Sequence, residues 1–144
     1  MDSREVSKRW PHIWRYLRVE SSGRFDHKFH TWDLGVDRLS PAEQAAAYEE
    51  WADFWEFRLA QWRDELAGDR RKWGPLEEWT DEMAYGCRRC AAYARGEDPG
   101  EPVPLSVRRP DLYAAKRARV AEIIAEVDAS RTYDSVAGTY DSVA

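Results

Sequence analysis

Apolar residues recur at intervals of three and four over much of the chain, a spacing that places their side chains on one face of an α-helix. The clearest run predicts a helix over residues 41–67, in which Ser40 is the N-cap, Pro41 takes the first helical position and Gly68 follows the end. Such a helix is long for a chain of 144 residues, so we expect it at the centre of a bundle. Its apolar stripe consists of Tyr48, Trp51, Trp55, Leu59, Trp62 and Leu66, and Phe54 and Phe57 widen it.

Three further segments show the same spacing. The first predicts a helix over residues 7–19 that begins between Ser7 and Pro11, because proline disfavours helical geometry in the residue before it. The others predict helices over residues 75–95 and 110–128, of which the earlier opens at Gly74–Pro75. The first apolar row is Val6, Trp10, Ile13 and Leu17, and the second is Leu76, Trp79, Met83, Cys87, Cys90 and Ala94. The third row is Tyr113, Val120, Ile123, Ile124 and Val127, and we expect it to face inward.

Helical spacing fails between these segments. Residues 19–38 mix turn formers with aromatic residues, and we interpret them as a packed loop in which Phe25, Phe29 and Trp32 allow a short hairpin. Residues 96–109 form a proline-rich connector that cannot be helical. The sequence thus predicts an all-α, single-domain bundle of about four helices over residues 1–129, with a Trp-rich core and a flexible C-terminal tail over residues 130–144.

Composition and charge narrow the classes of function. Hydrophobic residues make up 43% of the chain and include eight Trp, enough to build a core. The net charge of -5 argues against a general affinity for nucleic acid or anionic lipid, and the basic residues Arg108, Arg109, Lys116, Arg117 and Arg119 are interpreted as a solvated helix face. No apolar run could cross a membrane, and the first ten residues contain charges where a signal peptide would need its apolar stretch, so we expect a cytoplasmic protein without a membrane partner.

Two short motifs contain residue types that bind zinc. His27 and His30 lie three residues apart, as do Cys87 and Cys90, and together they make the Cys2His2 set that suits tetrahedral zinc. The fold would have to bring the motifs together, because a long segment separates them. Two alternatives stay open. The cysteines are small buried hydrophobic residues in a helical row, or they are a redox pair placed, unusually, far from a helix N-terminus.

Catalysis has no clear candidate in the sequence. Carboxylates are scattered over the predicted helix surfaces, no Ser-His-Asp set or Gly-rich phosphate motif is present, and His12 stands alone beside Pro11. The breadth of the Trp-rich stripe is typical of a partner surface, since Trp and Tyr concentrate binding energy at interfaces. We therefore favour a binding protein over an enzyme.

The chain ends with one six-residue phrase written twice, TYDSVA-G-TYDSVA, over residues 132–137 and 139–144. Two copies are too short to stack as a solenoid, so folding does not explain them. One interpretation is an inert duplication in a tolerant terminus. The other is presentation to a partner, since two copies of a recognised peptide raise its local concentration.

Two kinds of partner suit this duplicated phrase. A docking protein can add it as an edge strand or bind the terminal carboxylate of Ala144. A modifying enzyme can act on the hydroxyl, phenol and carboxylate groups, and this arrangement resembles the tandem cores at the C-terminal end of precursors to ribosomally made, post-translationally modified peptides. The residues that carry these groups are Thr132, Tyr133, Asp134, Ser135, Thr139, Tyr140, Asp141 and Ser142.

The leading hypothesis is accordingly a non-catalytic helical carrier or adaptor that binds another protein and displays the duplicated phrase. The alternative is a small regulatory protein stabilised by zinc, with an inert tail. Nucleic acid is not an expected partner, and the pattern is compatible with a homo-oligomer.

Overall fold

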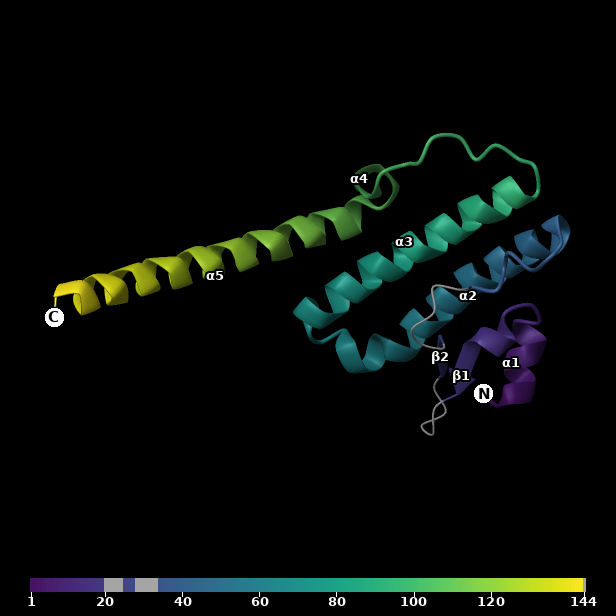
Figure 1. Ribbon diagram of the computed structural model, residues 1–144, viewed down its shortest axis with the longest axis horizontal. Coiled ribbons are helices and arrows are strands. Elements are labelled where there is room, and N and C mark those ends of the chain that lie inside the picture. The colour runs from purple at the N-terminus through teal and green to yellow at the C-terminus, as the bar shows by residue number, and fades with distance from the viewer. Residues whose placement is uncertain (20–24, 28–33, 144) are drawn as a thin grey trace. The chain divides into compact units, whose positions relative to one another are not determined.

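The computed structural model describes residues 1–19, 25–27 and 34–143, and within these ranges it describes the side chains of all residues except 19, 25–27 and 132–143. The all-α class is confirmed: the described residues contain five α-helices and little strand (Figure 1). In chain order the elements are α1 (Ser3–Arg9), a 3-10 turn (Trp14–Tyr16), β1 (Leu17–Val19), β2 (Phe25–His27), α2 (Pro41–Leu66), α3 (Arg70–Ala94), α4 (Leu105–Arg108) and α5 (Pro110–Val143).

The chain divides into two compact units. Unit 1 comprises Met1–Pro102 and contains α1, both strands, α2 and α3. Unit 2 comprises Val103–Ala144 and contains α4 and α5. The helix predicted over residues 110–128 lies in unit 2, as part of α5.

Helix α1 lies before Pro11, so the helix predicted over residues 7–19 is placed wrongly. The Asp2 side chain accepts hydrogen bonds from the backbone N–H of Arg4 and Glu5 at 3.0 and 2.9 Å, and the Glu5 carboxylate accepts one from the Asp2 N–H at 2.9 Å. This capping box starts the helix early. Pro11 then ends it, because its ring excludes helical geometry at Trp10.

After the 3-10 turn the chain forms a short antiparallel hairpin. Leu17 pairs with His27 and Val19 with Phe25, which confirms the hairpin predicted near residues 19–38 and moves its first strand two positions earlier. Two of the aromatic residues that suggested it, Phe29 and Trp32, lie outside the described residues. Beyond the hairpin, Gly35 has φ +71°, and a Cβ at this position would collide with the Tyr16 ring, so only glycine fits there.

Helix α2 agrees with its prediction to within one residue at the C-terminal end. The Ser40 Oγ accepts a hydrogen bond from the Glu43 N–H at 3.4 Å, and Ala67 is the C-cap. Helix α3, in contrast, begins at Arg70 and not at Gly74–Pro75. The Asp69 carboxylate caps it by accepting from the Arg71 and Lys72 N–H groups at 3.1 and 3.4 Å. With that cap in place, Pro75 removes only one intrahelical hydrogen bond in the second turn.

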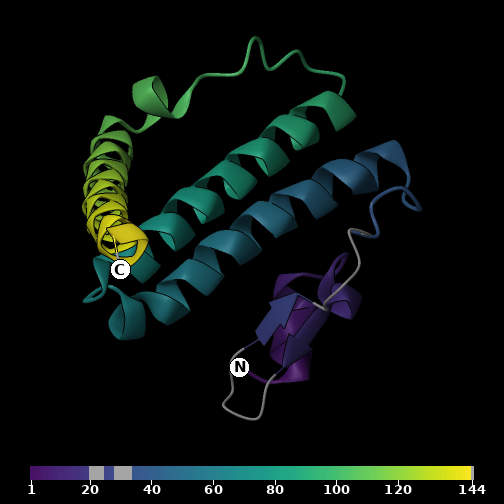
Figure 2. The same cartoon turned by 60° about the vertical axis from the view of Figure 1, so that its left-hand side comes forward.

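The core of unit 1 is centred on α2, which packs side by side with α3 in an antiparallel pair (Figures 1 and 2). Trp51 and Phe54 on α2, together with Trp10, are fully buried. Trp51 stacks on Trp55 with ring centroids 6.0 Å apart, and Trp10 meets Phe54 edge to face at 5.8 Å. The Trp-rich core that the stripe on α2 predicted is therefore present.

The buried face of α3 is rotated from the predicted row. Its buried members include Thr80, Ala84, Cys87 and Ala91, whereas Trp79 is 45% exposed. Bulky rings from α2 occupy the space between the helices, so mainly small residues of α3 fit opposite them. Trp79 instead contacts the rim of the core, edge to face with Trp55 at 5.0 Å.

A polar clamp, formed by Arg9, Trp10 and His12 with Glu50 and Asp53, fixes the N-terminal segment to α2. The Arg9 guanidinium donates two hydrogen bonds to the Asp53 carboxylate, at 2.8 and 3.1 Å, and the Trp10 indole donates a third at 2.9 Å. The Glu50 carboxylate accepts from the His12 backbone N–H at 2.8 Å and also contacts the His12 Nδ1. These bonds hold Trp10 in the core.

Helix α5 extends well past the predicted end at Asp128. Its backbone is helical from Pro110 to Val143, so most of the segment expected as a tail over residues 130–144 continues the helix. The sequence after Asp128 contains one glycine, Gly138, and no proline, so nothing in it forces a helix to stop. The side chains from Thr132 onward lie outside the described residues.

We predict that Phe54→Ala lowers the free energy of unfolding by about 3–5 kcal/mol, because it leaves a cavity among fully buried rings. Phe57→Ala is the matched control and should have a smaller effect, since Phe57 is only partly buried against the same cluster. Guanidinium denaturation followed by circular dichroism measures both. Equal losses in the two variants would contradict this account of the core.

Asp53→Asn should destabilise the protein at pH 7, and its difference from wild type should shrink in acid. The pKa of Asp53 lies below its usual value chiefly because Arg9 donates hydrogen bonds to the carboxylate. The charged form is therefore favoured in the folded state, and this stabilisation is present above about pH 4 and lost as the pH falls through the lowered pKa. Urea denaturation at pH 7 and about pH 3 tests this. Asp64→Asn, an exposed change on the same helix, should show little effect at either pH.

Candidate functional site

The duplicated phrase lies in the C-terminal part of α5, where the backbone is helical from Thr132 to Val143. Its period is seven residues, nearly two turns of a helix, so the Cα atoms of equivalent positions in the two copies lie on the same side of α5. The side chains proposed as the recognised or modified groups lie outside the described residues, and Ala144 lies outside them entirely. The prediction of a site at these residues therefore remains untested.

The five apolar residues of α5 that were expected to face inward are instead exposed, whereas Leu112 near the start of the helix is buried. Tyr113, Val120, Ile123, Ile124 and Val127 are 38–55% exposed. Within residues 103–143 the other helix is α4, a single turn too short to cover this face. We call these five residues the α5 apolar face.

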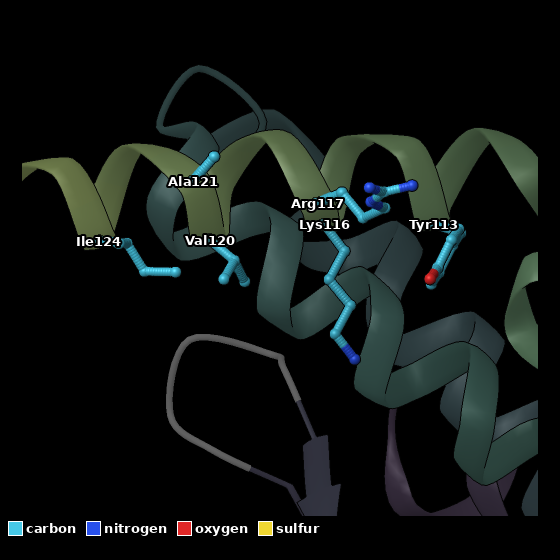
Figure 3. Close-up of a pocket in the computed structure, with 6 residues that line it drawn as sticks. All are labelled: Tyr113, Lys116, Arg117, Val120, Ala121 and Ile124. Carbon is cyan, nitrogen blue, oxygen red and sulfur yellow. The ribbon is translucent and has the colours of Figure 1, made fainter.

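Charged residues accompany the α5 apolar face. Figure 3 shows Tyr113, Lys116, Val120 and Ile124 projecting to the same side of the helix. Together with Arg117 and Ala121 they line a shallow hollow of about 340 Å³. The Arg117 guanidinium lies 6.0 Å from the centroid of the Tyr113 ring, close enough for a cation–π contact. The surface thus combines aliphatic groups with positive charge.

The two cysteines occupy different environments on α3. Cys87 is buried in the core cluster, and Cys90, one turn further on, is exposed. Burial, with a smaller contribution from Cys90, raises the pKa of the Cys87 thiol to about 12. Cys87 is therefore a neutral thiol at physiological pH and a weak nucleophile, which favours the interpretation as a buried hydrophobic residue over that as a redox pair.

The zinc prediction depends on histidines that the structure does not describe fully. The backbone of His27 lies in β2, its side chain is outside the described residues, and His30 is outside them altogether. Among the side chains that are described, no group of three or more His, Cys, Asp and Glu is arranged to hold a metal ion. A zinc site at His27, His30, Cys87 and Cys90 therefore stays a prediction.

Sequence reasoning missed the partner of His12. Glu50 binds this residue through its backbone N–H and contacts its ring, as part of the polar clamp. The position of Glu50 three residues before Asp53 on one face of α2 was the available signal. This spacing could not be interpreted from the sequence, because only the fold shows that Arg9 and His12 lie opposite the two carboxylates. The polar clamp attaches the N-terminal segment to α2, so we assign it a structural role.

Further ion pairs join α2 to α3 at the surface of unit 1. Arg88 donates a hydrogen bond to Glu56 at 2.6 Å, and Arg95 donates one to Glu49 at 3.2 Å. All four side chains are 40–53% exposed, so each pair contributes little to stability. They link the surfaces of the two helices, and we assign them no chemical role.

No known protein family, curated protein or solved structure matches the chain. In the part of the chain that the structure describes, no helix is both long and apolar enough to cross a membrane.

We predict that only one thiol of the folded protein reacts rapidly with a disulfide reagent at pH 8. Cys90 is exposed, whereas Cys87 is buried with a pKa of about 12. Titration with Ellman's reagent should give one fast thiol in the native state and two in guanidinium chloride. Cys90→Ser should remove the fast reaction and Cys87→Ser should not. Two fast thiols in the native protein would show that Cys87 is accessible.

Proposed function

We propose that this protein is a non-catalytic helical adaptor that binds another protein and presents the duplicated phrase on α5. The observation that supports this most directly is that α5 continues as one helix from Pro110 to Val143, through both copies of the phrase. Among the described side chains, the core cluster of unit 1 is built from residues between Val6 and Cys87. We therefore expect this core to form without the phrase.

The form of the helix favours one mode of recognition. Within α5 the backbone N–H and C=O groups are engaged in helical hydrogen bonds, so adding the phrase as an edge strand would first require them to be broken. Recognition of one helix face in a groove of the partner needs no such change. Because equivalent Cα atoms of the two copies share a side of α5, a groove two copies long could bind both at once.

The low helix propensity of the phrase also favours a role in binding a partner. Thr, Tyr, Asp, Ser and Val have low helix propensity, and Gly138 between the copies has a still lower one. A helix of this composition is marginal on its own in water, so burial against a partner would stabilise it. This is the behaviour of a segment whose order is completed by binding.

Unit 1 supplies the carrier in this proposal. Its core contains fully buried Trp10, Trp51 and Phe54, and the polar clamp fixes the N-terminal segment, so we expect it to keep its structure when the phrase is removed. The hydroxyl and phenol groups of the phrase also suit a modifying enzyme as the partner. In that case the chain is the precursor-like substrate, and the same segment is both recognised and modified.

Deletion of residues 132–144 should abolish capture of the partner while leaving the thermal unfolding of unit 1 unchanged. The immobilised full chain and the deletion variant are incubated with lysate of the source cells, and retained proteins are quantified by mass spectrometry. A specific partner is retained by the full chain, lost with the deletion, and displaced by the free peptide TYDSVAGTYDSVA. Intact-mass analysis of the chain recovered from cells reports any modification of the phrase.

A variant with residues 132–144 in scrambled order is the matched control, because it keeps the length, composition and charge of the segment. It should behave like the deletion. Removing residues 138–144 leaves one copy and should weaken capture more than twofold if both copies are used. Retention of the same proteins by the full chain, the scrambled variant and the deletion would refute the proposal.

A further inference from the structure

The α5 apolar face has the dimensions of a helix–helix contact. Its members Tyr113, Val120 and Val127 are spaced by seven residues, and Ile123 and Ile124 lie between the last two. This is the pattern of a short seam between two helices. All five side chains are at least 38% exposed, and Ile124 is 55% exposed. Contiguous aliphatic groups in water are unfavourable, so burial of this face would be stabilising.

The charges beside this face are separated along the helix. Lys116 and Arg117 precede its centre, and Glu126 and Asp128 follow it; all four are exposed. The two groups are nine or more residues apart, so they do not pair with each other within one helix, where partners are three or four residues apart. The arrangement is complementary to itself when a second copy runs in the opposite direction.

The geometry of such a pair follows from the sequence positions. If Val120 of one copy lies opposite Ile124 of the other in an antiparallel arrangement, Lys116 lies at the level of Asp128 and Arg117 between Glu126 and Asp128. Each copy then contributes the same surface twice, as a two-fold axis requires. A parallel pair would instead place the basic residues of the two copies side by side.

We propose that α5 pairs with α5 of a second copy of this chain, in an antiparallel two-fold dimer centred between Val120 and Ile124. The aliphatic seam supplies the affinity, and the opposed basic and acidic segments set the direction. The pairing uses residues 113–128 and does not involve the duplicated phrase. It is therefore independent of the proposed adaptor function. If both hold, the dimer presents its two phrases at opposite ends.

Sedimentation equilibrium of the full chain at low salt tests the pairing. The variant Lys116→Glu/Arg117→Glu and the variant Glu126→Lys/Asp128→Lys each bring like charges together in the antiparallel dimer. Each should raise the dimer dissociation constant about tenfold or more, given the energies of exposed ion pairs. An equimolar mixture of the two should form a heterodimer, because one α5 is then acidic and the other basic. The variant carrying all four changes should restore the wild-type constant, since it exchanges the two charged segments.

The seam is tested separately by Ile124→Lys, which should abolish dimerisation. Val107→Lys is the matched control: Val107 is 70% exposed but lies on α4, so its replacement should leave the dimer intact. Circular dichroism of every variant checks that helix content is retained. A monomeric full chain at about 1 mM would overturn the proposal, and so would a four-change variant no tighter than either pair of reversals. Dimerisation unaffected by Ile124→Lys would also overturn it, because the contact would then lie elsewhere.

Discussion

Close packing of bulky rings against small side chains is the constraint on which unit 1 depends. Trp51 and Phe54 occupy the centre of the core without solvent exposure, and α3 presents Ala84 and Ala91 on its buried face. Large residues on one helix require small ones on its neighbour, because the interior is filled to the density of an organic crystal. The same requirement rotates α3 so that Trp79 lies at the rim. The alignment of α2 and α3 is thus a consequence of ring volume, which the exposed ion pairs only supplement.

The polar clamp extends this core to the N-terminal segment. Trp10 is fully buried, and its indole N–H needs an acceptor, which Asp53 supplies. Arg9 shares the same carboxylate and lowers the pKa of Asp53, so the bond is charged at neutral pH. The segment around Trp10 is thereby attached to α2. Unit 1 thus closes its core with residues that are far apart in the sequence.

Helix α5 differs from α2 because a row of its apolar residues is exposed. The α5 apolar face is exposed, basic residues precede acidic ones between positions 113 and 128, and the backbone of α5 is helical through the duplicated phrase as far as Val143. A helix gains most of its stability from packing, so these features are understandable if α5 packs against another molecule. The proposed antiparallel second copy would cover the middle of the helix, and the proposed protein partner would bind its end. Unit 1 then serves as the body that both associations share.

The sequence by itself determined the all-α class, the extent of α2 from Ser40 to Ala67, and the heptad-length period of the duplicated phrase. Each depends on neighbours within a turn or two, where capping and helical spacing act. Only the tertiary structure decided that α1 precedes Pro11, that small residues line the buried face of α3, and that His12 meets Glu50. Periodicity shows which residues share a face and cannot show what covers it. For the same reason the apolar row of α5 was expected inside the protein, whereas burial depends on a neighbour that the row does not specify.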